Sequence, residues 1–249
     1  MFITDLDNTL VGDKAALAEL NQQLTAHRDQ YGSVIVYSTG RSPTLYHELR
    51  QEQEMIDPDY TVLSVGTLIY ASGSPRVSGE PDAGWSQVLS EGWDRDAIMA
   101  TTAHFADLVP QPDSEQTAHK ASFLLQPDIA DELLPRLQNA LTQKGLDIQL
   151  VYSSGQDLDI LPKRGNKGAA VAFLQQRLNM SPERTVVCGD SGNDLSMFEA
   201  ASAKGIIVGN ARDELREWHQ REASEDIYLA QAHCAGGILE GMKHFGFLT

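Results

Sequence analysis

The stretch MFITDLDNTLVG (residues 1–12) places two carboxylates, Asp5 and Asp7, directly after a short apolar run. Residues 1–4 have the length and composition of a buried strand, and the acidic and small polar residues that follow indicate a loop at its end. In an open parallel sheet, ligands bind outside the carboxyl ends of the strands. Two carboxylates so close together at such a point are suited to binding one divalent cation while one of them attacks phosphorus.

Short apolar runs alternate with longer helical patterns on both sides of a central segment of different character. This alternation predicts an α/β fold with a Rossmann-like parallel sheet. The expected strands are residues 1–4, 34–38, 185–188 and 205–208, and the expected helices are residues 15–30, 44–53, 166–179, 195–203 and 236–245.

The central segment has an α+β pattern of its own. Residues 70–84 are rich in Gly, Ser and Pro, which indicates a loop at a domain edge. Helical patterns follow at residues 94–108 and 129–143, with strand patterns at residues 120–125 and 148–152. We therefore expect a core domain made of residues 1–80 and 162–249, with residues 81–161 inserted as a second domain.

Composition narrows the classes of partner. The chain has 249 residues and carries 35 acidic against 19 basic residues, for a formal net charge of −16. A field of this sign repels polyanions, so nucleic acids and anionic membrane surfaces are disfavoured as partners. The two cysteines, Cys188 and Cys234, have no metal-ligand spacing and suit free thiols in a reducing compartment. With an acidic N-terminal stretch and no apolar run long enough to cross a bilayer, we expect a cytoplasmic protein.

A second motif follows the strand expected at residues 34–38. Thr39 and Gly40 end this strand, and Ser42 and Pro43 are a typical N-cap and first residue of a helix. Backbone amides at a helix N-terminus, together with the Thr39 hydroxyl and the nearby Arg41, form an anion site.

Two further motifs lie in the second half of the chain. Lys167 begins the helix that follows the inserted segment, and the acidic loop GDSGND (residues 189–194) follows another strand. Asp190 and Asp194 are hard oxygen ligands of the kind that magnesium prefers. With Asp5 and Asp7 they would place four carboxylates at one sheet edge, where a cation is needed to offset their repulsion.

Other hydrolase and nucleotide-binding classes fit less well. The string GDSG (residues 189–192) is similar to the nucleophile loop of chymotrypsin-like proteases, but those are β-barrels, and this chain has no histidine in a matching context. The phosphate loop of nucleotide-binding proteins and the dinucleotide glycine fingerprint are both absent from the sequence.

Taken in order and spacing, these four motifs resemble those of the haloacid-dehalogenase superfamily. The resemblance implies a parallel-sheet core with an inserted α+β cap domain of the C2 type. The chain is more closely similar to the sucrose-phosphate phosphatase family of cyanobacteria and plants, through residues 5–13, 153–162 and 236–240. Residues 117–119 of the cap fit the family's pattern less well. Residues 205–211 (GIIVGNA) resemble the strand that follows the fourth motif of the superfamily.

The resemblance implies a role for each motif. Asp5 would be the nucleophile that forms an aspartyl phosphate, and Asp7 would protonate the leaving sugar oxygen and then activate water. Magnesium would be the cofactor. The expected metal ligands are Asp5, Asp7, Asp190 and Asp194, and the groups expected to hold or orient the phosphoryl group are Thr39, Gly40, Arg41, Lys167 and Asn193.

The inserted segment carries candidate sugar-binding residues. Alternate residues of a strand share a face, so Asp157 and Asp159 point the same way, as do Lys120 and Ser122. Carboxylates accept hydrogen bonds and a lysine donates them, which suits hydroxyl recognition. A solvent-facing sheet surface would show the same pattern.

The resemblance to the sucrose-phosphate phosphatase family implies magnesium-dependent hydrolysis of sucrose 6-phosphate to sucrose and phosphate, the last step of sucrose synthesis. A phosphatase for another phosphorylated glycoside or hexose remains open, as does a sugar-binding protein of the same fold without turnover. We expect a monomer whose partner is a small sugar phosphate, with association with a sucrose-phosphate synthase as a further possibility.

Overall fold

The computed structural model describes residues 1–71, 79–153, 155–200, 202–222 and 224–248. The chain folds into two compact units. Residues 1–80 and 167–249 form the first unit, and residues 81–166 form the second. The sequence placed the second boundary earlier, after residue 161. Residues 162–166 belong with the inserted unit because Gln149 donates to the carbonyls of Pro162 and Gly165.

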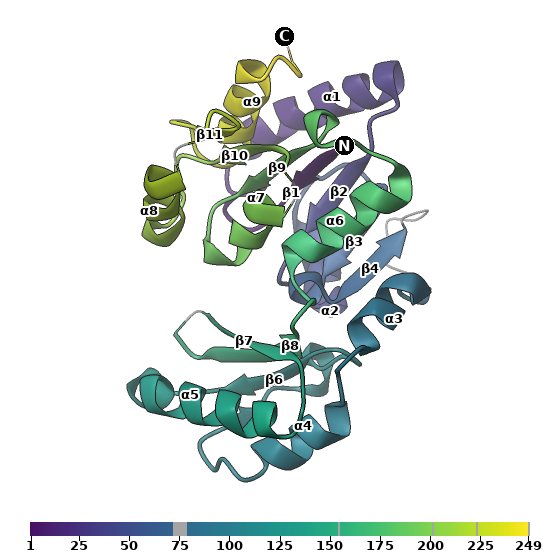
Figure 1. The fold of residues 1–249 in the computed structure, drawn as a ribbon. Helices are drawn as coiled ribbons and strands as arrows, with labels where there is room; N and C mark the ends of the chain where they lie inside the picture. Colours follow the sequence, from purple (N-terminus) through teal and green to yellow (C-terminus); the bar gives the residue numbers. More distant parts are fainter. Residues whose placement is uncertain (72–78, 154, 201, 223, 249) are drawn as a thin grey trace. The chain divides into compact units, whose positions relative to one another are not determined.

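A seven-stranded sheet forms the centre of the first unit, in the order β11-β10-β9-β1-β2-β3-β4 (Figure 1). Its strands are β1 (Phe2–Thr4), β2 (Ile35–Ser38), β3 (Tyr60–Leu63), β4 (Leu68–Ala71), β9 (Val186–Gly189), β10 (Lys204–Ile207) and β11 (Ile227–Leu229). The predicted α/β core around a parallel sheet is confirmed, although β3, β4 and β11 were not among the expected strands and one strand is antiparallel. β4 pairs antiparallel with β3, because only the short turn η1 (Ser64–Gly66) connects them and no helix is available for a crossover.

The helices of the first unit are α1 (Lys14–Tyr31), α2 (Pro43–Glu52), α6 (Lys167–Leu178), α7 (Leu195–Ala200), α8 (Asp213–Glu222) and α9 (Cys234–His244). Apolar side chains of α1, α2 and α9 share one core cluster with residues of the sheet. α6 and α7 pack together on the opposite face (Figure 1). The Asp13 side chain caps α1 by accepting hydrogen bonds from the amides of Ala15 and Ala16. This cap fixes the point at which the loop after β1 ends and α1 begins. Ser42 caps α2 with Pro43 in its first turn, as expected.

A four-stranded antiparallel sheet in the order β5-β6-β8-β7 forms the inserted unit. Its strands are β5 (Val109–Pro110), β6 (Ala121–Leu124), β7 (Ile148–Ser153) and β8 (Asp157–Pro162), and its helices are α3 (Ala83–Ser90), α4 (Arg95–Thr102) and α5 (Pro127–Gln143). Side chains of α4 and α5 bury one sheet face in a separate core cluster.

Some predicted element boundaries were wrong. The helix expected at residues 94–108 ends at Thr102, since tight turns at His104 and Phe105 redirect the chain and bury Leu108. The loop expected at residues 70–84 overlaps the end of β4 and the start of α3; residues 72–78 of it, and Ser154 of the stretch 153–162, lie outside the described residues. The helix expected at residues 195–203 is described only to Ala200. Cys188 and Cys234 are buried free thiols, as predicted.

Candidate active site

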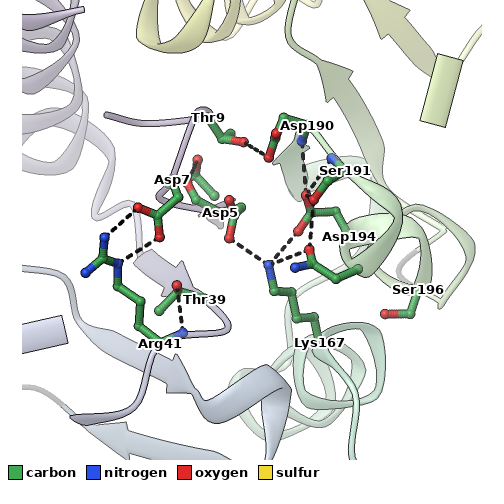
Figure 2. Close-up of polar contacts among 12 residues, drawn as sticks. Asp5, Asp7, Thr9, Thr39, Arg41, Lys167, Asp190, Ser191, Asp194 and Ser196 are labelled. Atoms are coloured by element: carbon green, nitrogen blue, oxygen red, sulfur yellow. Dashed lines mark hydrogen bonds and ion pairs between the residues drawn. The ribbon is translucent and has the colours of Figure 1, made fainter. Parts of the chain in front are cut away.

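The candidate active site lies at the carboxyl ends of three adjacent strands. Because β9, β1 and β2 are neighbours and parallel, the loops that follow them meet at one edge of the sheet. Asp5 directly follows β1, Thr39 follows β2 and Asp190 follows β9 (Figure 2). Short-range sequence patterns thus place these groups at strand ends, and strand order brings the ends together.

Three buried carboxylates form an acidic cluster at this edge. Asp5, Asp190 and Asp194 each offer a ligand oxygen, and these oxygens lie within 4.8 Å of one another. The loop after β9 is organised by Asp194, whose Oδ2 accepts the amides of Asp190 at 3.0 Å and Ser191 at 3.1 Å. Thr9 Oγ1 donates to Asp190 Oδ1 at 3.1 Å and so links the loops after β1 and β9.

Lys167 neutralises part of this cluster. Its side chain is fully buried, and its Nζ donates to Asp5 Oδ1 and Asp194 Oδ1, each at 2.6 Å, and to Asn193 Oδ1 at 3.1 Å (Figure 2). Burial favours the neutral amine, but attraction by Asp194 and Asp5 outweighs it and raises the pKa of Lys167. The lysine is therefore a fixed positive charge at the centre of the site.

Two carboxylates of the cluster, those of Asp5 and Asp190, have raised pKa values. Burial raises the pKa of Asp5 to about 8, against the opposing attraction of Lys167 and with added repulsion from Asp194 and Asp190. Burial and repulsion from Asp194 raise the pKa of Asp190 to about 6. One lysine thus does not offset the crowding of three carboxylates, and a hard divalent cation is the ligand that these oxygens fit.

Asp7 lies apart from the acidic cluster. Its two carboxylate oxygens each accept a hydrogen bond from the Arg41 guanidinium, from Nε and Nη2, at 2.8 Å (Figure 2). The structure thus brings three of the four expected metal ligands together, because this two-point pairing with Arg41 turns the Asp7 carboxylate aside. Arg41 was expected to hold phosphate, but two donors of its guanidinium group are bonded to Asp7.

The loop after β2 is the one expected from the sequence to bind an anion. Thr39 is buried, and its Oγ1 accepts the amide of Arg41 at 3.2 Å. The turn η1 supports this loop through two backbone hydrogen bonds. The Ser64 amide donates to the Arg41 carbonyl at 2.8 Å, and the Val65 amide donates to the Thr39 carbonyl at 3.2 Å. Ser64 and Val65 both have positive φ, at 51° and 59°, which is costly for a β-branched residue and marks a constrained turn.

The four candidate sugar-binding residues lie in the inserted unit, and three of them form a connected group. Asp159 Oδ1 accepts from Ser122 Oγ at 2.6 Å and from Lys120 Nζ at 3.0 Å, and all three side chains are buried. They are therefore not a solvent-facing surface. Asp157 is separate and partly exposed, and its Oδ1 accepts from Gln111 Nε2 at 3.0 Å.

Sequence reasoning missed the polar residues that hold the loops. Thr9 stood inside the first motif, where its hydroxyl could have suggested a bond to a neighbouring carboxylate. Asn210 follows β10, and its Nδ2 donates to the Asn8 carbonyl at 2.7 Å. The only sequence signal for Asn210 was its place in the stretch that resembles the superfamily.

No helix among the described residues is long and apolar enough to cross a membrane.

Comparison with known proteins gives consistent matches along the chain. Residues 1–246 match the sequence model of the family described as sucrose-6F-phosphate phosphohydrolase. Sucrose-phosphatase 1 of Nicotiana tabacum is 40% identical over 98% of the chain, which spans only 59% of that relative's length. A mannosylfructose-phosphate phosphatase of Agrobacterium fabrum is 35% identical, with 98% of this chain and 95% of the relative covered.

Solved structures agree with these matches. The sucrose-phosphatase of Synechocystis sp., solved in complex with sucrose and phosphate, superposes with a TM-score of 0.86 at 40% identity, covering 98% of this chain and 96% of that one. A haloacid dehalogenase-like hydrolase of Bacillus subtilis has a TM-score of 0.70 at 20% identity, covering 98% and 90%. The second match supports the fold alone.

Proposed function

Because this chain belongs to the sucrose-6F-phosphate phosphohydrolase family, we propose that it is a magnesium-dependent phosphatase that hydrolyses sucrose 6-phosphate to sucrose and phosphate. The observation that carries the proposal is the cluster of Asp5, Asp190 and Asp194 around the buried Lys167. This arrangement offers a nucleophile, hard oxygen ligands and a fixed positive charge within one small volume.

The first chemical step uses Asp5 and Asp7. A carboxylate oxygen of Asp5 attacks phosphorus in line, the bond from phosphorus to the sugar oxygen breaks, and Asp7 donates a proton to that oxygen. In the second step Asp7 takes a proton from water, the water oxygen attacks the phosphorus of the aspartyl phosphate, and phosphate leaves with Asp5 regenerated. Asp7 must leave its pairing with Arg41, at least in part, to make these proton transfers.

The remaining residues stabilise charge on the transferring group. Lys167, the Thr39 hydroxyl and the Gly40 amide are the donors for phosphoryl oxygens, and Asn193 orients Lys167 through their hydrogen bond. Asp5, Asp190 and Asp194 would hold Mg²⁺, which would supply positive charge beside the phosphoryl group. Asp7 would join them only after turning from Arg41.

A second candidate substrate class has specific support. The Agrobacterium relative is named for mannosylfructose phosphate and is covered over nearly its whole length. A phosphatase for another phosphorylated glycoside is therefore the alternative, and the chemistry at Asp5 would be the same. The inserted unit, with Lys120, Ser122, Asp157 and Asp159, is where we place sugar selectivity.

Phosphate release over a panel of substrates tests both candidates. Sucrose 6-phosphate should give the highest kcat/KM, ahead of mannosylfructose phosphate, fructose 6-phosphate and glucose 6-phosphate. Asp5→Asn should lower turnover at least about a thousandfold, because an amide is not a competent nucleophile. Its Tm should stay close to that of the wild type, which separates lost chemistry from lost folding.

Each negative result has its own meaning. If kcat/KM is higher for mannosylfructose phosphate than for sucrose 6-phosphate, mannosylfructose phosphate is the preferred substrate and the proposed substrate is wrong. Turnover by Asp5→Asn within tenfold of the wild type would remove the nucleophile assignment. No phosphate release from any sugar phosphate in excess magnesium would favour a sugar-binding protein without turnover.

A further inference from the structure

The peptide group between Asn8 and Thr9, one residue beyond Asp7, is held by a side chain from outside this loop. Asn8 is exposed and adopts a left-handed backbone with φ 58°. Inside the loop, the amides of Leu10 and Val11 both donate to the Leu6 carbonyl at 2.9 Å. The Asn8 carbonyl instead accepts from the side chain of Asn210, which comes from a distant part of the chain.

Asn210 bridges two segments with the two ends of its carboxamide. Its Nδ2 donates to the Asn8 carbonyl at 2.7 Å, and its Oδ1 accepts the amide of Cys234, the first residue of α9, at 2.8 Å. The orientation of the carboxamide follows from its partners, because a carbonyl can only accept and an amide N–H can only donate. The side chain thus ties the loop that carries Asp7 to the N-terminus of α9.

The backbone around Asn210 is fixed on both sides. Gly209 donates to the Ala232 carbonyl at 2.8 Å, and the Arg216 side chain donates to the carbonyls of Gly209 and, at 2.8 Å, Ala211. A Cβ at Gly209 would lie 2.2 Å from the Gln231 carbonyl oxygen, so only glycine permits this approach. The position of Asn210 therefore depends on the segment at Gln231 and Ala232.

Glu240 holds that segment in turn. From α9, its carboxylate accepts the amides of Gln231 at 3.1 Å and Ala232 at 2.8 Å, and the Tyr228 hydroxyl at 2.7 Å. Burial alone would raise the pKa of Glu240, but these donors outweigh it and lower the pKa. The carboxylate stays ionised and accepts strong, charge-assisted hydrogen bonds.

We propose that Asn210 and Glu240 are positioning residues for Asp7, acting through the Asn8 carbonyl. Glu240 orders the backbone at Ala232, this backbone sets Asn210, and Asn210 fixes the peptide group between Asn8 and Thr9, one residue beyond Asp7. The inference rests on the proposed function, in which Asp7 must reach the leaving oxygen to protonate it. Proton transfer requires hydrogen-bond reach, so a small displacement of this loop acts on the leaving-group step.

Leaving-group dependence tests the proposal. A sugar oxygen needs a proton as it leaves, whereas p-nitrophenolate leaves without one. Hydrolysis of the aspartyl phosphate uses Asp7 with either substrate, so the comparison is made on the first step, as the release of sucrose or p-nitrophenolate in a single turnover. Asn210→Ala should lower this rate by about thirtyfold for sucrose 6-phosphate and by less than about threefold for p-nitrophenyl phosphate, with both half-saturating concentrations within about twofold. Glu240→Gln should give the same pattern with a smaller loss, and Asn139→Ala, an exposed asparagine on α5, should change neither substrate.

Double variants separate positioning from a general structural effect. If Asn210 acts through Asp7, adding Asn210→Ala to Asp7→Asn should cause no further loss on sucrose 6-phosphate, and Asn210→Ala with Glu240→Gln should be no slower than Asn210→Ala alone. Equal losses on both substrates, or additive losses in the doubles, would overturn the proposal. If Asn210→Ala does not fold, Glu240→Gln and its double with Asp7→Asn decide by the same comparison.

Failure of the proposed function would be seen separately, in the wild type. If the wild type does not hydrolyse sucrose 6-phosphate but accepts another sugar phosphate, the leaving-group comparison is made with that substrate. If the wild type hydrolyses no phosphate ester, both the proposed function and this inference are rejected.

Discussion

Lys167 shows how one residue makes a crowded acidic site compatible with folding. A buried charge is costly unless it is paired, and here one ammonium contacts two carboxylates that lie far from it in sequence. The pairing is incomplete, because three carboxylates face one lysine. Burial, together with repulsion between the carboxylates, raises the pKa values of Asp5 and Asp190.

A dependence of magnesium binding on pH follows from these two carboxylates. Without metal, their pKa values of about 8 and about 6 exceed the ordinary value, near 3.9, so the folded state binds more protons than the unfolded state in this window. Their contribution to stability is present at low pH and is lost as pH rises through the folded pKa values. Magnesium needs the ionised carboxylates, so the rise in Tm caused by magnesium should grow from about pH 5 to about pH 8.

Thermal unfolding in excess magnesium and in excess chelator measures this effect. At a magnesium concentration about 100 times Kd, the stabilisation at the higher pH should approach about 2.7 kcal/mol. Asp190→Asn is the control, since it removes one ligand and should reduce the gain at every pH. A gain in Tm that does not change with pH would contradict this account of the cluster.

At the level of elements, the packing of α6 against α7 places Lys167. The next residue, Gly168, has no room for a side chain, because a Cβ there would lie 1.8 Å from the Ser196 carbonyl oxygen. Its amide also donates to Ser196 Oγ at 3.1 Å. The close approach of these two helices therefore depends on glycine directly beside the lysine.

Gly168→Ala should separate the two helices and move Lys167 from its partners. We expect a loss of about 1–3 kcal/mol in the free energy of unfolding, typical of overpacking, together with a fall of at least about tenfold in kcat. Urea unfolding and phosphate release measure the two effects.

Gly236→Ala in α9 is a matched control for a helical glycine. Its nearest contact would be the Ala232 Cβ at 3.4 Å, so it should fold normally and keep its turnover. If Gly168→Ala has wild-type stability and kcat, the packing of α6 on α7 does not set the position of Lys167.

At the scale of the whole molecule, the two units have separate cores and carry different polar groups. The Lys120–Asp159 ion pair, at 3.0 Å and with Ser122 on the same carboxylate, is buried inside the inserted unit. Asp157 is partly exposed and has its own contact with Gln111. The two aspartates of β8 should therefore respond differently to substitution.

Asp159→Ala should destabilise the protein by about 3–5 kcal/mol, because it leaves the Lys120 charge buried without its partner. Asp157→Ala should leave Tm nearly unchanged and lower kcat/KM for sucrose 6-phosphate at least about tenfold, while p-nitrophenyl phosphate stays within about threefold. Thermal unfolding and the two-substrate comparison test both. Equal loss on the two substrates in Asp157→Ala would mean that Asp157 supports the fold and does not select the sugar.

Four strands of the core sheet, β1, β2, β9 and β10, and the positions of the acidic residues after them were predictable from the sequence because they depend on local patterns. An apolar run of strand length followed by Asp5, or by Asp190, places a carboxylate at a strand end in any parallel sheet. The caps of α1 and α2 are equally local. β3, β4 and β11 were not predicted, and the antiparallel direction of β4 depends on how η1 turns and not on its own composition.

Tertiary structure decided which of those side chains meet. The sequence grouped Asp7 with the metal ligands because it is close to Asp5 in the chain, but Arg41 turns its carboxylate away. Lys167 contacts Asp5 across 162 positions, and Asn210 contacts Asn8 across 202. Such contacts depend on strand order and on the packing of α6 and α9, which no local pattern encodes, so the composition of the site was readable from sequence and its geometry was not.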